Sequence, residues 1–221
     1  IQQALAPTQE SWPGPIRAAV LCALFEEDGC LCVLLTRRAA SLRSHTSEVS
    51  FPGGRLEPGE EPHEAALRET FEEAGLFLAY QRDGSLLSFH ADRTDPFHRC
   101  RGLLRLGKVG FRDLLQKEGL TLAADRLHYF SHWVTPWFYP IRYDVRFFVA
   151  EAPAGQEAVH DGGELTEHVW IKPRDALRFH REGRFDMVFP TVMTMKALSQ
   201  FGTIREAIQS TRNKRIVLES G

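Results

Sequence analysis

The sequence predicts a fold of the α/β or α+β class, with helices packed around one sheet, and three observations support this class. Apolar, strand-like runs at 16–25 and 30–36 are joined by Glu-Glu-Asp-Gly, which is typical of a hairpin turn. A helical pattern spans 62–74, with a proline in its first turn and a glycine directly after its end. Apolar and polar residues then alternate over 143–149, as expected for a strand.

The other elements follow from the same signals in chain order. Residues 1–15 contain three prolines and are expected to form an irregular N-terminal arm. A polar loop leads to 48–51, and strand character recurs in two further stretches, at 127–134 and 168–171. Helices are expected near 111–118, 173–181 and 189–201. We therefore predict an arm (1–15), a single domain (16–205) with a helical insertion at about 78–125, and a C-terminal tail (206–221).

The composition is that of an ordinary globular protein, 43% hydrophobic and 25% charged. A formal net charge of −2 provides no general attraction to nucleic acid or to an acidic membrane. The four cysteines and nine histidines lack zinc-site spacing, so we expect no zinc, and free thiols fit a reducing compartment. No run is long enough to span a bilayer. We expect an intracellular protein, cytoplasmic by default; an organelle stays open because the chain begins with Ile1 rather than Met.

The helix predicted over 62–74 concentrates carboxylates on one face. At 100° per residue, Glu69, Glu72 and Glu73 fall within about 100° of one another. The opposite side is suited to the core and carries Ala66, Leu67, Thr70, Phe71 and Ala74. A solvated acidic face is one interpretation, although like charges at this spacing repel. The other is a site for a hard divalent cation such as Mg²⁺, which prefers oxygen ligands. Composition alone favours neither.

The surrounding residues resemble the Nudix signature, because the required glycine and polar residues stand at the required spacing. The match reads Gly54-x5-Glu60-x7-Arg68-Glu69-x-x-Glu72-Glu73-x-Gly75-Leu76. Thr70 departs from it, since the family usually has an aliphatic residue there, but a threonine methyl can fill the same place in the core. The resemblance implies a mixed sheet between helices, with the signature forming a loop, a helix and a loop. It also implies metal-dependent hydrolysis of a diphosphate linkage.

Residue roles are carried over from the same resemblance. It implies that Glu69, Glu72 and Glu73 hold Mg²⁺ or Mn²⁺, with Glu72 and Glu73 counted as catalytic. Arg68 is counted with them because it would orient a glutamate rather than touch the substrate, and Glu60 would tie down the loop. Two further residues, Gly53 and Gly54, would let the backbone approach the metal and the phosphates closely.

A second resemblance lies upstream of the signature. The stretch 34–54 is similar to the element that precedes it in Nudix enzymes acting on coenzyme A, although Ala39, Ser47 and Glu48 depart from that pattern. It implies a substrate-binding loop formed by Arg38, Arg43 and His45, and arginine forks suit the 3′-phosphate of coenzyme A. Ordinary solvated loop arginines are the alternative.

Other residues have both a functional and a structural interpretation. Glu164, preceded by two glycines, is our candidate for a further metal ligand or general base; a charged turn residue is the alternative. The aromatic residues Trp133, Trp137 and Tyr139 could stack on an adenine ring or serve in packing. The basic stretch 93–117 could cap the substrate, but we expect it to be the solvated side of the insertion.

The sequence thus predicts a diphosphatase that uses Mg²⁺ or Mn²⁺ and acts on coenzyme A or acyl-CoA, releasing 3′,5′-ADP and (acyl-)4′-phosphopantetheine. A hydrolase of ADP-ribose, a nucleotide sugar or NADH is the enzymatic alternative. A Nudix-fold ligand sensor is the non-enzymatic one, although sensors commonly lose signature glutamates and all are present here. The expected partner is a small nucleoside diphosphate derivative, not nucleic acid or membrane; a homodimer is left open.

Overall fold

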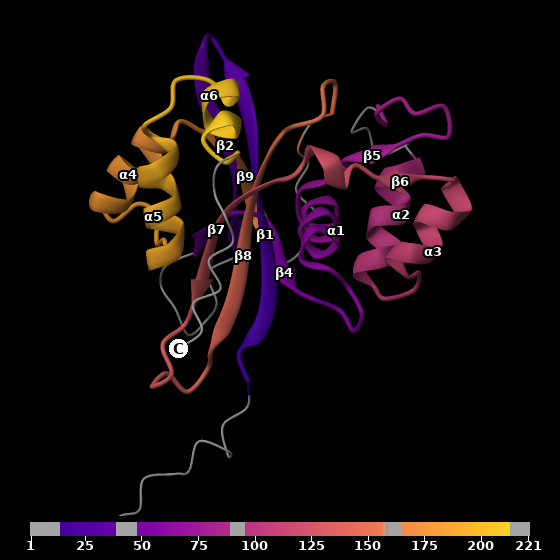
Figure 1. Cartoon of the computed structure of the whole chain (residues 1–221), viewed down its shortest axis with the longest axis horizontal. Coiled ribbons are helices and arrows are strands. Elements are labelled where there is room, and N and C mark those ends of the chain that lie inside the picture. Colours follow the sequence, from indigo (N-terminus) through magenta and orange to yellow (C-terminus); the bar gives the residue numbers. More distant parts are fainter. Residues whose placement is uncertain (1–13, 39–47, 89–95, 157, 159–164, 213–221) are drawn as a thin grey trace, which may run out of the picture.

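The computed structural model describes residues 14–38, 48–88, 96–156, 158 and 165–212. A sheet forms the middle layer of the molecule (Figure 1). One face of this sheet is covered by the helix α1 (Pro62–Ala74), and the other by α4 (Pro173–Arg181), α5 (Phe189–Leu198) and α6 (Ile204–Gln209). The expected mixed sheet between helices is confirmed.

The chain enters the sheet through an antiparallel hairpin of β1 (Ile16–Glu27) and β2 (Cys30–Arg38). Its two central turn residues, Asp28 and Gly29, have φ values of 50° and 69°. Positive φ at both positions matches the right-handed twist of the flanking strands, which explains why Asp-Gly stands there. The hairpin expected from the sequence is confirmed.

The sheet combines both strand directions. Its order is β3 (Val49–Ser50), β2, β1, β8 (Tyr143–Glu151) and β7 (His128–Val134). The β1–β8 pair is parallel and the other pairs are antiparallel. Two more strands join from the side: β4 (Gly53–Arg55) pairs with β1, and β9 (Leu165–Ile171) pairs with β2. The β4–β1 pairing places the signature loop beside the middle of the sheet.

Both faces of the central strand β1 are buried. Leu21 and Ala23 face the α1 side, whereas Cys22 and Leu24 face the side of α5 and α6. Each face therefore builds its own hydrophobic core, and the apolar run of β1 shows no alternation because both faces are covered.

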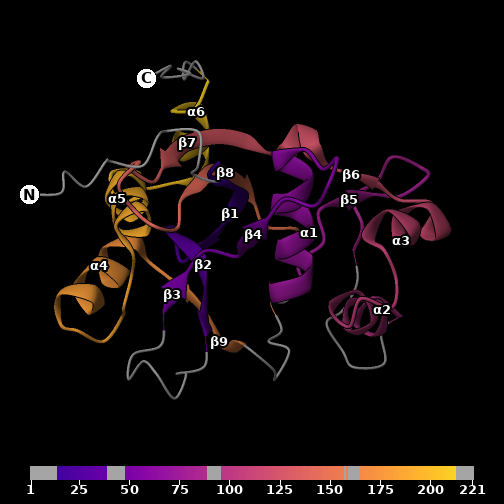
Figure 2. The same cartoon turned by 90° about the horizontal axis from the view of Figure 1, so that it is seen from below.

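The insertion after α1 forms a third layer beyond that helix (Figure 2). It comprises β5 (Ala79–Tyr80), α2 (Pro96–Arg105), α3 (Phe111–Glu118), β6 (Thr121–Leu122) and a short 3-10 helix at Ala124–Arg126. A separate hydrophobic cluster holds it to α1, with Phe71 stacked on Phe77 at 4.2 Å between ring centroids. The expected helix over 111–118 is confirmed, whereas α2 was not predicted.

The C-terminal elements differ slightly from expectation. The helix α5 ends at Leu198 rather than at residue 201. The last described helix, α6, crosses the expected domain end at residue 205, and its Ile204 and Ala207 are buried in the core beside α5. Among the described residues, no helix is both long and apolar enough to span a membrane.

Candidate active site

A buried ion pair joins the signature loop to α1. Arg68 donates hydrogen bonds to both carboxylate oxygens of Glu60, at 2.8 and 3.0 Å, and one to the carbonyl of Arg55 at 2.9 Å. Glu60 also accepts from the backbone amide of Glu57 at 2.8 Å. Because the Arg68 and Glu60 side chains are only 5% and 7% exposed, this bidentate pair fixes the loop against the helix.

Arg68 also reaches the carboxylate face of α1. Its guanidinium lies 2.9 Å from Glu69 and 3.6 Å from Glu72. Burial lowers the pKa of Arg68, but its bond to Glu60 and the charges of the neighbouring glutamates outweigh this and hold the pKa above its ordinary value. Arg68 therefore contacts Glu69 directly, while its role in orienting a metal ligand stays a prediction.

The two loop glycines lie directly against the carboxylates of Glu73 and Glu69. The backbone amide of Gly53 donates to Glu73 at 3.0 Å. A β-carbon at Gly54 would collide with the carboxylate of Glu69, and one at Gly53 would collide with the β1 residues Ala19 and Val20. At Gly53 a larger residue would meet backbone atoms, and at Gly54 it would displace the Glu69 carboxylate, whereas the expected approach of these glycines to metal and phosphates stays a prediction.

Two of these carboxyls are harder to ionise than usual. Burial raises the pKa of Glu69, against the opposing charge of Arg68. Burial likewise raises the pKa of Glu72, to about 7. The charge of Arg68 opposes this rise, and the neighbouring charge of Glu69 adds to it. A pair of partly buried carboxylates with incomplete charge compensation favours the arrival of a cation.

The donor chemistry of this face fits Mg²⁺ or Mn²⁺. Carboxylate oxygens are the ligands these hard cations prefer. Within the described ranges, no three His, Cys, Asp or Glu side chains are grouped so that they could hold a metal ion by themselves. Mg²⁺ does not require such a cage, since it usually takes one or two carboxylates and completes its octahedron with water and substrate phosphates.

The C-terminal end of α1 is held by two residues that the sequence did not single out for this task. Arg101 of α2 donates from Nε to the carbonyl of Glu72 at 2.9 Å and from Nη2 to the carbonyl of Glu73. His168 of β9 donates to the same Glu73 carbonyl at 3.0 Å. Arg101 is 3% exposed, so the expectation that the basic stretch is solvated is wrong at this position. The only hint of this burial in the sequence is that Arg101 lies four residues after Phe97 and three before Leu104, on the same side of a helix.

Thr70 lies on the core side of α1, as expected. It is fully buried, and its hydroxyl donates to the carbonyl of Ala66 at 2.7 Å. This bond satisfies the polar group within its own helix, so the methyl can pack where an aliphatic residue is usual.

Several predicted residues are not placed. Arg43, His45 and Glu164 lie outside the described residues, and Arg38 is described only as the last residue of β2, without its side chain. The roles assigned to these four residues stay predictions.

The three aromatic residues occupy different surroundings. Trp133 packs edge-on against Phe189, with ring centroids 5.7 Å apart. In contrast, Trp137 and Tyr139 are 75% and 50% exposed, in the loop between β7 and β8. Trp133 therefore packs against a helix of the fold, whereas the exposed Trp137 and Tyr139 contact Phe138 of their own loop.

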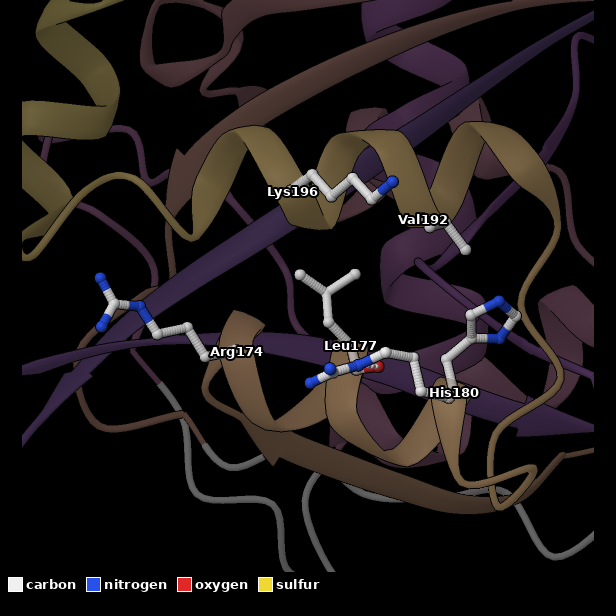
Figure 3. Close-up of a pocket in the computed structure, with 6 residues that line it drawn as sticks. Arg174, Leu177, His180, Val192 and Lys196 are labelled. Atoms are coloured by element: carbon white, nitrogen blue, oxygen red, sulfur yellow. Dashed lines mark hydrogen bonds between the residues drawn. The ribbon is translucent and has the colours of Figure 1, made fainter.

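A groove of about 620 Å³ lies between α4 and α5, on the face of the sheet opposite to α1. Figure 3 shows Leu177 of α4 and Lys196 of α5 on its two sides. Its lining contains none of the signature residues, so the groove is separate from the carboxylate face.

Comparisons with known proteins identify the family of this chain. The model of the NUDIX domain matches residues 15–189. Nudix hydrolase 3 of Caenorhabditis elegans is 59% identical over 58 residues, which cover 26% of this chain and 24% of that protein. A peroxisomal coenzyme A diphosphatase 1 of Saccharomyces cerevisiae is 46% identical over 67 residues, covering 29% of this chain and 20% of the yeast protein.

Among solved structures, a NUDIX hydrolase from Alicyclobacillus acidocaldarius is similar with a TM-score of 0.77 and 26% identity, over 89% of this chain and 96% of that one. The chain spans between a fifth and just over half of the length of the curated relatives that it matches. The carboxylate helix, its buried Arg68–Glu60 pair and a family match over most of the sequence lead to one conclusion: this chain belongs to the NUDIX domain family.

Proposed function

We propose that this chain hydrolyses a diphosphate linkage with the help of Mg²⁺ or Mn²⁺, and that its substrate is coenzyme A or an acyl-CoA. The observation that carries the hydrolase proposal is the carboxylate face of α1, where Glu69 and Glu72 share Arg68 and Glu73 is held by Gly53. Such a face costs stability through repulsion, and that cost is offset when a dication binds.

Each residue of the face has a separate task in this proposal. Glu69, Glu72 and Glu73 would hold the metal, which when bound neutralises phosphate charge and lowers the pKa of water. Arg68 keeps Glu69 oriented, and Glu60 keeps Arg68 in place. The amide of Gly53 orients Glu73. We also propose Glu164 as a further ligand or general base.

The reaction consumes one water molecule and breaks one P–O bond of the diphosphate. With coenzyme A as the substrate, the products are 3′,5′-ADP and 4′-phosphopantetheine; with acyl-CoA, the second product keeps its acyl group. Since positioning and charge neutralisation dominate phosphoryl chemistry, a rigid carboxylate face suits the reaction.

The coenzyme A proposal is supported by the upstream stretch 34–54 and by the yeast relative, which is named a coenzyme A diphosphatase. In this proposal Arg38, Arg43 and His45 bind phosphate groups of the substrate. This stretch begins within β2, includes β3 and ends in β4 with Gly53 and Gly54. Arg38 ends β2, and Arg43 and His45 follow it in the sequence, ahead of Gly53, whose amide binds Glu73.

The test is a substrate comparison. Purified protein is incubated with Mg²⁺ or Mn²⁺ and, separately, with coenzyme A, acyl-CoA, ADP-ribose, a nucleotide sugar and NADH, and the products are separated by chromatography. We expect 3′,5′-ADP from the first two, with the Glu72→Gln variant as the control for contaminating activity. Rapid cleavage of ADP-ribose with none of coenzyme A would contradict the substrate proposal. No cleavage, combined with tight binding of one compound, would favour a ligand sensor.

A further inference from the structure

The C-terminal turn of α1 carries two of the proposed metal ligands, and it is anchored from outside the Nudix signature. Arg101 of the insertion donates to the carbonyls of both Glu72 and Glu73. We infer that Arg101 is a positioning residue for these two carboxylates, so that the insertion takes part in building the metal site. This inference rests on the proposed function.

Arg101 binds carbonyls that have no donor within α1 itself. The last four carbonyls of an α-helix have no partner within the helix. At the end of α1, the amide of Gly75 takes the carbonyl of Phe71 at 2.9 Å, which leaves those of Glu72 and Glu73 to be satisfied from elsewhere. Arg101 supplies both, and His168 adds a second donor to Glu73.

Arg101 also supplies charge where the helix needs it. A cation near the C-terminal end of a helix is stabilised by the helix dipole. The last turn of α1 contains no basic residue of its own. Because Arg101 is almost fully buried there, its charge acts at low dielectric beside Glu72 and Glu73.

The position of Arg101 is fixed by the packing of α2. Spacing along the helix puts it on the same side as Phe97 and Leu104. Leu104 is buried in the cluster between the insertion and α1, and Phe97 meets Phe77 edge-on at 5.9 Å between centroids. The packing of α2 therefore holds the Arg101 guanidinium against the end of α1, and Figure 2 shows α2 beside α1.

Glu73 is consequently held at two ends. Gly53 holds its carboxylate, and Arg101 with His168 holds its carbonyl. Loss of Arg101 would remove the donor to the Glu72 carbonyl and one of the two donors to the Glu73 carbonyl, and would thus loosen the last turn while leaving the carboxylates themselves intact. Groups of this kind, which orient metal ligands without touching the metal, typically change metal affinity or activity by about 10–100-fold when they are mutated.

The test measures metal binding directly, by titrating the full chain with Mn²⁺ alone and following free Mn²⁺ by electron paramagnetic resonance. For Arg101→Met we expect the Mn²⁺ dissociation constant to rise about 10-fold and kcat at saturating metal to fall by a similar factor, with KM for the diphosphate changed less than about twofold. Arg101→Lys should recover part of the loss, because it restores the charge but not the planar fork. Arg99→Met, which removes an exposed charge from the same helix, is the matched control.

Wild-type Mn²⁺ affinity and kcat in folded Arg101→Met would overturn the inference. Should that variant not fold, Arg101→Gln takes its place, and unchanged affinity there has the same meaning. If the wild-type chain binds Mn²⁺ but cleaves no diphosphate, while Arg101→Met or Arg101→Gln binds Mn²⁺ more weakly than Arg99→Met, the inference stands and the proposed function fails.

Discussion

On α1, the carboxylates of Glu69 and Glu72 share the guanidinium of Arg68, at 2.9 and 3.6 Å. The side chains of these glutamates are 17% and 19% exposed, so water screens their repulsion only partly. Such residues destabilise the metal-free protein slightly and are expected at a site where a ligand supplies the missing charge. Two consequences of this arrangement, and one prediction for the upstream arginines, can be measured at single residues.

The first consequence concerns catalysis. Glu72→Gln and Glu73→Gln keep the size of the side chain but remove a metal-binding charge, so kcat should fall by about 100-fold or more in each. The folded state should be retained, as checked by circular dichroism. Glu118→Gln, at an exposed position on α3, is the control. Activity within a few-fold of wild type would mean that the face does not bind the catalytic metal.

The second consequence concerns pH. Burial raises the pKa of Glu72 from 4.5 to about 7, so between these values the folded protein holds a proton that the unfolded chain has released. The contribution of Glu72 to the free energy of unfolding therefore falls as pH rises through this window. Without metal, Glu72→Gln should gain stability relative to wild type from about pH 4.5 to 7 and then level off. Urea denaturation with a chelator checks this, and a difference that does not vary with pH would refute it.

The prediction for the upstream arginines concerns substrate choice. If Arg38 and Arg43 bind the 3′-phosphate of coenzyme A, replacing each with Ala should remove contacts of about 1.5–3 kcal/mol. This corresponds to a loss in kcat/KM of about 10–100-fold. The loss should be much smaller with dephospho-coenzyme A, which lacks that phosphate. Arg174→Ala, in the groove on the opposite face, is the control. Equal losses on both substrates would assign the arginines to the diphosphate or to loop structure.

At the scale of elements, local signals and tertiary contacts contribute differently. The boundaries of α1 were predicted correctly because Pro62 and Gly75 mark its ends, and Gly75 indeed has a left-handed φ of 76°. The carboxylate face followed from the spacing within the same helix. In contrast, α2 gives little local signal, and it packs through Phe97, Arg101 and Leu104 against a helix elsewhere in the chain. A role that depends on such contacts is not visible in sequence spacing.

A prediction about the insertion follows from its cluster. Phe77 is fully buried between Phe71, Phe97 and Phe111, with centroid distances of 4.2, 5.9 and 5.8 Å. Phe77→Ala should lower the free energy of unfolding by about 3–5 kcal/mol, because it removes apolar contacts and leaves a cavity. Urea denaturation measures this. Phe25→Ala, at a residue 46% exposed on β1, is the control and should cost far less.

If Phe77 also keeps α2 seated against α1, the same variant should weaken Mn²⁺ binding, because Arg101 moves with α2. A variant that loses stability but binds Mn²⁺ as tightly as wild type would separate the insertion from the metal site. The stability measurement and the metal titration thus report on two different properties of one packed cluster.

At the scale of the whole molecule, one sheet serves two cores. Leu21 and Leu24, three residues apart on β1, belong to cores on opposite faces. The signature loop pairs with the same strand through Gly53 and Gly54, so the glutamate face is built against a strand that is buried on both faces. The fold class could be predicted because strands and helices interleave. The pairing order could not, because an apolar run buried on both faces carries no information about its neighbours.

The parallel pairing of β1 with β8 has a consequence for biosynthesis. Residues 16–24 pair with residues 143–151, so more than half of the chain separates the two halves of this ladder. At about 5–20 residues per second, a ribosome takes several seconds or longer to make the intervening stretch. During that time one edge of an apolar strand has no partner, and contacts of such long range also form slowly. The nascent chain is therefore expected to be most prone to aggregation, and most dependent on chaperones, before β8 emerges.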